Sequence, residues 1–136
     1  MSIPADFPWP HEGIVGHGTH AGIPWVARRV PGGEWMGNPV NGYIKIPEGH
    51  PWSLTDDYVD TGVPWGEITY RSGASGWIGF DTGHDGQWWP GSEIRRAKWF
   101  GGLGMEMSEE LVIAWAQLFA ANAALASSGV TFGDYA

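Results

Sequence analysis

The segment GFDTGHDG, residues 79–86, holds the side chains of this chain that are best suited to proton transfer. It contains the carboxylates of Asp81 and Asp85 and the imidazole of His84. An Asp–His pair can fix one imidazole tautomer and activate a water molecule for hydrolysis. The same residue types also make an ordinary turn, in which aspartates accept backbone N–H groups and glycines adopt positive φ. We favour a turn beside a pocket, to which Asp81 or His84 contributes, and keep Asp81, His84 and Asp85 as catalytic residues of an alternative hydrolase.

A second pair of histidines, His17 and His20, has a spacing that suits metal ligands. With Asp81 and His84, the pair would offer imidazole and carboxylate ligands to zinc, manganese or iron. The chain has no cysteine, which excludes thiolate zinc sites, disulfides and cysteine nucleophiles. No HExxH helix is present either. We therefore expect no cofactor, with a divalent metal at these four residues as the alternative.

Arginine and tryptophan residues form the third group that suggests chemistry. Five of the seven Lys and Arg residues fall into two short clusters, around residues 28–29 and 95–98. Arginine binds phosphate through paired hydrogen bonds, and indole rings stack on bases, so the clusters predict a site for a phosphorylated, base-bearing ligand. The residues expected to bind it are Arg28, Arg29, His50, Trp52, Asp81, His84, Trp88, Trp89, Arg95, Arg96 and Trp99.

The motifs of the common nucleotide-binding and hydrolase folds are missing from the sequence. The glycine-rich stretches 16–18 and 101–104 can offer backbone N–H groups to phosphate. Neither stretch matches a P-loop or GxGxxG, and no GxSxG serine motif is present. A simpler interpretation of the second basic cluster is a salt-bridged surface in which Arg95 and Arg96 pair with Glu93. We leave both interpretations open.

The composition limits the kinds of partner. The 136 residues carry a formal net charge of −8, which argues against nonspecific binding to nucleic acid or anionic membranes. Each buried indole N–H needs a partner, so some of the 10 tryptophans are expected at a ligand site or subunit interface. No signal-peptide pattern opens the sequence, and the apolar run 111–116 is far shorter than the ~20 residues that span a bilayer. We expect a protein that acts in the cytoplasm.

A C-terminal helix over residues 107–128 is the clearest structural prediction. Ser108 suits the N-cap position, and no proline or glycine follows until Gly129. Apolar residues surround this helix instead of keeping to one stripe, so it must be covered on more than one side. A small sheet covers only one side. Either the N-terminal loops wrap the rest of the helix or a second subunit covers it, and we favour a homo-oligomer formed through the helix residues Leu111–Leu125.

Upstream of the helix, short segments of alternating apolar residues predict an antiparallel sheet. Strands are expected at residues 22–30, 41–47, 66–72 and 76–81, with the SGASG connection forming a hairpin between the last two. The fold class is α+β, with a small antiparallel sheet, long Gly/Pro/Trp-rich loops and one C-terminal helix. We expect one domain over 1–136, with a loop-rich segment 1–40, a sheet core 41–104 and the helix 107–128.

Several of these segments resemble, in the same order, small uncharacterised proteins of actinobacterial phages. Those proteins carry GYxxVPxGHPW, HGG[IL]T[FY] and WWxGFDCxHxxD segments followed by a C-terminal helix. The resemblance covers about residues 40–125, through GYIKIPEGHPW (42–52), GEITY (66–70) and GWIGFDTGHDG (76–86). Two positions depart from the pattern, because Trp65-Gly66-Glu67 replaces His-Gly-Gly and Thr82 replaces the cysteine. The matched positions are Gly49, His50, Pro51, Trp52, Gly79, Phe80, Asp81 and His84.

The resemblance implies a phage accessory protein in the cytoplasm of an infected bacterium, where such proteins often oppose host defence. Our first hypothesis is an oligomer without catalytic activity that sequesters a small nucleotide-like ligand, such as a defence signal. The second is a small hydrolase that uses Asp81 and His84, with or without a metal. The third is an inhibitor that binds a host enzyme through surface tryptophans and acidic charge.

Overall fold

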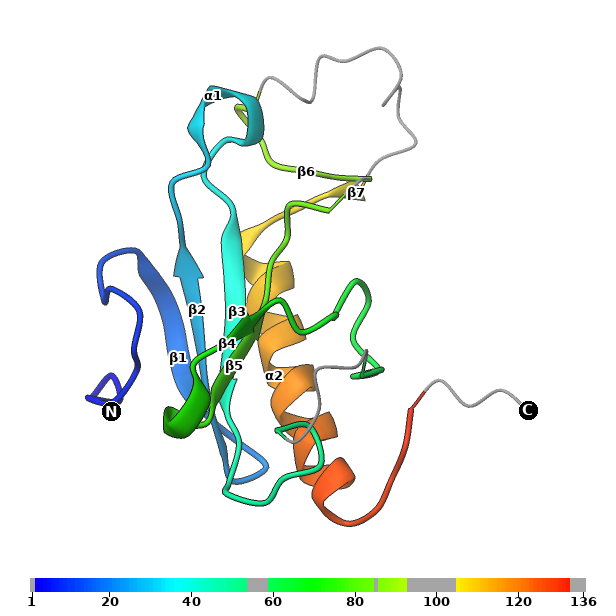
Figure 1. Cartoon of the computed structure of the whole chain (residues 1–136). Coiled ribbons are helices and arrows are strands. Elements are labelled where there is room, and N and C mark those ends of the chain that lie inside the picture. Colours follow the sequence, from blue (N-terminus) through cyan, green and yellow to red (C-terminus); the bar gives the residue numbers. More distant parts are fainter. Residues whose placement is uncertain (1, 54–58, 85, 93–104, 133–136) are drawn as a thin grey trace.

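A five-stranded antiparallel sheet forms the centre of the molecule, and one long helix lies on one of its faces (Figure 1). The computed structural model describes residues 2–53, 59–84, 86–92 and 105–132. Neighbouring strands follow the order β1-β2-β3-β5-β4. Their bounds are β1 (Ile14–His20), β2 (Ile23–Arg29), β3 (Val40–Lys45), β4 (Tyr70–Arg71) and β5 (Trp77–Phe80). The predicted α+β fold is therefore confirmed.

The remaining elements are short, except for the C-terminal helix α2 (Glu109–Ser127). The helix α1 (Gly33–Met36) connects β2 to β3, and the 3₁₀ turn η1 (Gly73–Ser75) connects β4 to β5 as the predicted hairpin. The strands β6 (Gln87–Trp88) and β7 (Met105–Glu106) form a separate parallel pair. In Figure 1 this pair and α1 lie beyond one end of the main sheet.

The strand β1 was not predicted, because its glycines resemble those of a loop. In the structure, Gly16 and Gly18 lie under the indole ring of Trp25 on the neighbouring strand. A Cβ atom at either glycine would approach the Trp25 or Ile113 side chain to about 3.1 Å. Glycine within a strand often marks such a close approach. Residues 14–20 therefore belong to the sheet and not to a loop-rich arm.

The helix α2 begins where the sequence predicts. The Oγ atom of Ser108 accepts the backbone N–H of Leu111 at 3.2 Å, which satisfies one of the free N–H groups of the first turn. Glu109 and Glu110 place negative charge at the positive end of the helix dipole. The predicted N-cap is therefore confirmed, and it fixes the position at which the helix starts across the sheet.

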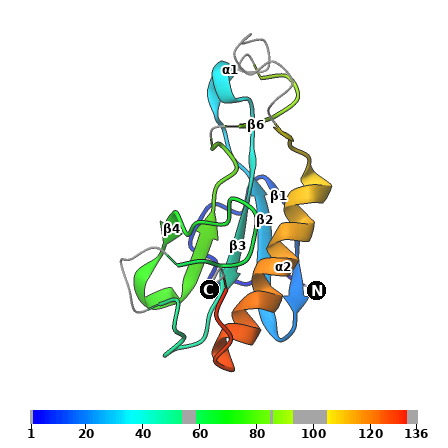
Figure 2. The same cartoon turned by 90° about the vertical axis from the view of Figure 1, so that its right-hand side faces the viewer.

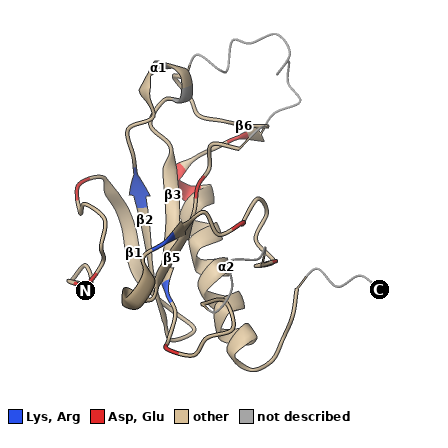
Figure 3. Ribbon diagram, in the orientation of Figure 1, with Lys and Arg blue, Asp and Glu red and all other residues tan. Residues whose placement is uncertain are grey.

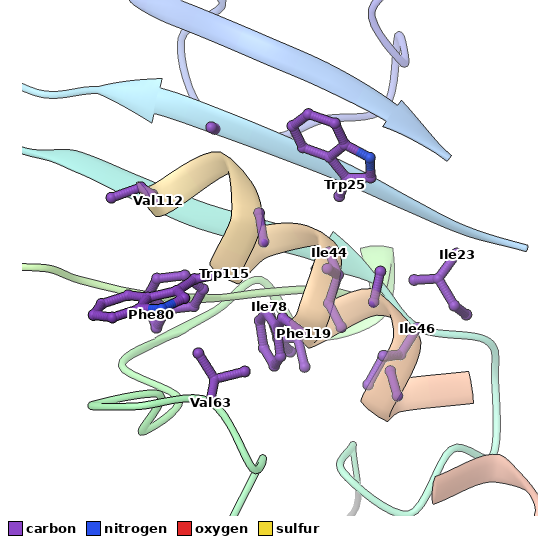
Figure 4. Close-up of a cluster of buried hydrophobic side chains, with 14 of the residues drawn as sticks. Ile23, Trp25, Ile44, Ile46, Val63, Ile78, Phe80, Val112, Trp115 and Phe119 are labelled. Carbon is purple, nitrogen blue, oxygen red and sulfur yellow. The ribbon is translucent and has the colours of Figure 1, made fainter. Parts of the chain in front are cut away.

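The main hydrophobic core lies between α2 and the sheet (Figure 4). Val112, Ala116 and Phe119 on α2 are fully buried against Ile44 and Phe80 on the strands. α2 would be long and apolar enough to cross a membrane, but 44% of the relevant window is buried within the fold. Core helices of globular proteins meet the same criterion, and we interpret α2 as one of them.

The opposite face of the sheet, which we call the outer face, has its own smaller core. Val26, Tyr43 and Trp77 on the strands are buried there together with Phe7 from the N-terminal segment. The ring of Phe7 meets those of Trp77 and Tyr43 edge-on, at centroid distances of 5.0 and 5.3 Å. The N-terminal segment therefore covers part of the outer face, on the side of the sheet away from α2 (Figure 1).

His50 links the loop after β3 to the C-terminal half of α2. Its Nε2 lies 2.8 Å from the carbonyl oxygen of Ala123, and its Nδ1 accepts the backbone N–H of Trp52 at 3.0 Å. This network assigns the proton to Nε2. Trp52 is also buried, and its ring stacks on Phe119 with centroids 5.6 Å apart. Both residues were expected at a ligand site, but their visible contacts belong to the core.

We predict that replacing His50 by Leu destabilises the fold by about 2–4 kcal/mol, because the Trp52 N–H and the Ala123 carbonyl both lose a buried partner. Chemical denaturation, followed by circular dichroism, measures this loss. The control is His20→Leu, since His20 is exposed at the end of β1. Equal stability of the two variants would contradict the structural role of His50.

Candidate functional site

The strand register brings polar side chains into one row across the outer face. Arg28 on β2 lies opposite Asn41 on β3, and Gly42 lies opposite Phe80. Asn41 therefore neighbours Asp81, which follows Phe80 at the end of β5. The row joins a cation, an amide and a carboxylate that are separated by 13 to 53 positions in the sequence.

A second row, of aromatic residues, lies directly beside the first. Tyr43 and Tyr70 lie opposite Gly79 from its two sides, so their rings meet across it at 5.7 Å. A Cβ atom at position 79 would lie 2.4 Å from the Tyr43 ring, so only glycine allows this contact. The half-buried Trp9 continues the aromatic surface, with its ring 4.7 Å from Tyr43 and 6.1 Å from Tyr70.

These residues form one site, which we call the outer-face cluster. Asn41 is at its centre, donating from Nδ2 to the Tyr70 hydroxyl at 3.3 Å and accepting the Thr82 N–H at 3.0 Å. Arg28 donates from Nε to the carbonyl oxygens of Pro10 and Glu12, at 2.6 and 3.2 Å. The cluster consists of Arg28, Asn41, Tyr43, Tyr70, Asp81 and His84.

Asp81 and His84 approach each other at the edge of the cluster. Nε2 of His84 lies 3.0 Å from Oδ1 of Asp81, in an ion-pair contact whose angle does not suit a hydrogen bond. About a quarter of each side chain is exposed, 28% for Asp81 and 24% for His84. Oδ2 of Asp81 accepts the Gly83 N–H at 3.2 Å, and Oε1 of Gln87 accepts the His84 N–H at 3.1 Å. The segment is thus a turn fixed by hydrogen bonds, and the side chains of Asp81 and His84 lie at the edge of the cluster.

Thr82 has a structural role in the turn after β5. Its hydroxyl donates to the Val40 carbonyl at 2.7 Å. The indole Nε1 of Trp89 donates to the Thr82 carbonyl and hydroxyl oxygens, at 3.2 and 3.1 Å. Thr82 is fully buried and Trp89 nearly so. These bonds hold the turn that carries Asp81 and His84 against β3.

Both tyrosines of the cluster have a raised pKa. Burial raises the pKa of Tyr43, and the neighbouring Tyr70 raises it further, against the opposing effects of Asn41 and Arg28. Burial also raises the pKa of Tyr70, with Asp81 as the second cause. Both hydroxyls are therefore neutral at physiological pH and can donate hydrogen bonds. Because the folded state favours the neutral form of both tyrosines, their protonation contributes to the stability of the fold. This contribution is complete below about pH 10, the pKa of tyrosine in an unfolded chain, and is lost as the pH rises through the higher pKa values of the folded state.

The expected basic and aromatic site is divided between two faces of the sheet. Arg29 follows Arg28 in β2, so its side chain points to the other face. There it donates from Nη2 to Glu109 at 2.5 Å and from Nη1 to the Asn38 carbonyl at 2.5 Å. Its guanidinium also lies 5.8 Å from the ring centre of Trp89. Arg29 therefore fastens the start of α2, whereas Trp89 donates its indole N–H to Thr82 and Trp88 is half-buried on β6.

The histidine pair of the metal alternative does not converge. His17 lies opposite Val26 of the outer core, whereas His20 lies opposite Ile23 of the main core, so the two side chains leave β1 on opposite faces. Across the described ranges, no group of three or more His, Asp or Glu residues is arranged to hold a metal ion. Four of the expected residues, Asp85, Arg95, Arg96 and Trp99, lie outside the described part of the chain.

Comparison of the chain with known protein families, with curated proteins and with solved structures finds no match. The outer-face cluster is therefore interpreted from its own chemistry. Three of its residues, Asn41, Tyr43 and Tyr70, were missed in the sequence. The signal was present in the alternation of β3, since Asn41 and Tyr43 share a face with Arg28 once the strands are paired.

We predict that Asp81→Asn lowers the pKa of Tyr70, because it removes the negative charge that disfavours the tyrosinate. Carbon-13 NMR of labelled tyrosine rings follows the ionisation, and Tyr70→Phe assigns the signal. The control is Asp60→Asn, because Asp60 lies in the turn that contacts Gly62 and not in the cluster. An unchanged Tyr70 titration in Asp81→Asn would show that the cluster is not assembled in solution.

Proposed function

We propose that the protein is a binding protein without catalytic activity, and that its outer-face cluster holds a small phosphorylated ligand with a planar ring. The observation that carries the proposal is the position of Arg28 on the face of the sheet opposite α2, where it pairs with Asn41 and is close enough to the Tyr43 and Tyr70 hydroxyls to affect their pKa values. Guanidinium groups bind phosphate oxygens in pairs, and aromatic rings stack on bases. A nucleotide-like molecule offers both partners at once.

Four residues of the cluster, together with the adjacent Trp9, have defined parts in this proposal. Arg28 is already held by two backbone carbonyls, so less side-chain entropy is lost when it binds phosphate. Tyr70 and Trp9 offer partly exposed ring faces for stacking. Asp81 can accept hydrogen bonds from hydroxyl or amino groups of the ligand, and a protonated His84 would offset the repulsion between Asp81 and phosphate.

The contact between Asp81 and His84 favours a second candidate, a small hydrolase. A carboxylate beside an imidazole can orient the ring for removing a proton from water. In this alternative Arg28 and the tyrosines still bind the ligand. His84, oriented by Asp81, takes a proton from a water molecule, and that water attacks the ligand. The two candidates differ in one observable: the bound molecule is released unchanged by a binding protein and hydrolysed by an enzyme.

The biological setting of the proposal comes from the resemblance to actinobacterial phage proteins. An accessory protein of a phage acts in the cytoplasm of the infected host, where bacteria produce nucleotide signals of infection. Sequestering such a signal requires tight binding and no turnover. The proposed role is therefore interference with host defence, and the ligand class follows from the chemistry of Arg28 and the adjacent rings.

We predict that the protein purified from cells with active nucleotide-signalling defences retains such a ligand, and that Arg28→Gln reduces the retained fraction. The expected loss in affinity is about tenfold or more, since a charge-assisted hydrogen bond contributes roughly 1.5–3 kcal/mol. Native mass spectrometry measures occupancy, and denaturation releases the molecule for identification. The control is Arg29→Gln, which removes the same charge from the opposite face.

The state of the released molecule separates the candidates. An intact nucleotide supports binding, whereas a hydrolysed product that disappears in His84→Ala supports the hydrolase. Equal occupancy of Arg28→Gln and the wild type would contradict the assignment of the site. A protein without any small molecule, but firmly bound to a host enzyme, would support the third hypothesis of an inhibitor.

A further inference from the structure

The side of α2 that faces away from the sheet carries an apolar seam, which consists of Leu111, Ala114, Leu118, Ala121 and Leu125; Leu111, at its start, is also partly buried against the main core. Leu118 and Leu125 are 38% and 48% exposed, although the rest of the helix packs on the sheet. The seam positions alternate in steps of three and four residues. This is the a/d spacing of a coiled coil, in which one helix packs along another. Among the described helices and strands, α2 makes its main contacts with β1, β2 and β3, so it packs on the sheet from one side (Figure 2).

The seam is unusual for a surface exposed to water because it lacks charge. Between Leu111 and Ser127 the helix contains no Lys, Arg, Asp or Glu, and α2 is uncoloured beyond its first turn in Figure 3. A solvated helix side normally carries charged residues. The polar Asn122 does not face water either, because it is buried and donates to the Thr61 carbonyl at 2.8 Å. The outward side of α2 therefore has the composition of an interface.

We propose that a second copy of this chain covers the seam, with the two α2 helices packed antiparallel. Side-chain size supports this occupant. In an antiparallel pair the a positions of one helix face the d positions of the other. Leu118 then faces Ala121 of the partner subunit, and Leu125 faces Ala114 of the partner subunit. Large residues pack against small ones in every layer, whereas a parallel pair would alternate Leu–Leu and Ala–Ala layers of unequal thickness.

The acidic residues at the start of α2 support the same orientation. Glu109 is paired with Arg29, but Glu110 is exposed and carries negative charge beside the seam. A parallel pair would bring the Glu110 carboxylates of both copies together. An antiparallel pair places them about one helix length apart, roughly 28.5 Å for 19 residues at 1.5 Å each. It also aligns the two helix dipoles favourably.

Trp65 is a second large apolar side chain that is exposed near α2. Its indole is 42% exposed and lies 6.3 Å from the ring of Trp115 on α2. Trp65 has φ of +49°, a conformation that is unfavourable for a bulky residue. The turn is held by the Thr61 hydroxyl, which donates to the Gly66 carbonyl at 2.8 Å. Tryptophan is enriched at protein interfaces relative to the rest of the protein surface.

A lipid surface is a poorer occupant of the seam than a second copy. Helices that bind anionic membranes carry Lys and Arg along the borders of their apolar face. The borders at the start of α2 carry Glu106, Glu109 and Glu110, and the whole chain has a net charge of −8. The seam also lies on the side of α2 remote from the outer-face cluster, so this inference is independent of the proposed function.

We predict that the wild type is a dimer in analytical ultracentrifugation and that Leu118→Glu is a folded monomer, with the dimer dissociation constant raised at least about a hundredfold. The matched control is Met105→Glu, because Met105 is also 38% exposed but lies on β7, outside the seam. Circular dichroism verifies that each variant is folded. A monomeric wild type at high micromolar concentration, or a dimeric Leu118→Glu, would overturn the proposal.

The orientation is tested by disulfide crosslinking, which is simple because the chain has no cysteine. Leu125→Cys mixed with Ala114→Cys should form a mixed disulfide, since these positions face each other in the antiparallel pair. Each variant alone should not crosslink, because like positions lie about 16 Å apart, beyond the reach of a disulfide. Crosslinking of Leu125→Cys with itself would overturn the antiparallel arrangement. Binding of monomers to phosphatidylserine vesicles would assign the seam to lipid instead.

Discussion

A single helix must cover one face of a five-stranded sheet, and the functional surfaces of the molecule are those that this contact leaves open. Phe119 and Val112 fill the space between α2 and the strands. On the outer face, the N-terminal segment brings in Phe7 and holds Arg28 through the carbonyls of Pro10 and Glu12, whereas Asp81 and His84 keep about a quarter of their side chains exposed. The far side of α2 is also partly exposed and has no charge to keep it solvated. One surface is suited to a polar, ring-bearing ligand, and the other to an apolar partner.

The aromatic content of the chain is accommodated by glycines in the central strands. Gly42 lies under the ring of Phe80 on the helix side, and Gly79 lies under the ring of Tyr43 on the outer side. A Cβ atom at either position would lie 2.4 Å from the ring. The sheet therefore supports large rings on both faces. The outer rings in turn limit the hydration of the tyrosine hydroxyls, which is the main cause of their raised pKa values.

Local signals in the sequence predicted local structure well. The Ser108 cap and the hairpin between β4 and β5 depend on neighbouring residues, and both were predicted. The strand β1 was missed because the reason for Gly16 and Gly18 is the close approach of the Trp25 side chain, which is known only once the strands are paired. Arg28 and Arg29 were assigned to one site because pairing, not sequence, determines the face on which each lies. His50 was assigned to a ligand for a similar reason, since its partner Ala123 is 73 residues away.

The most direct test of the account is to map which face of the sheet a ligand perturbs. A mixture of 5′-mononucleotides, added to isotope-labelled protein, would be followed through backbone amide NMR shifts. The account predicts shifts at Arg28, Asn41 and Asp81, with the amides of residues 114–125 unchanged. Shifts confined to α2 or to the turn at Gly49, or no shift at millimolar nucleotide, would contradict the assignment of the outer-face cluster as the binding site.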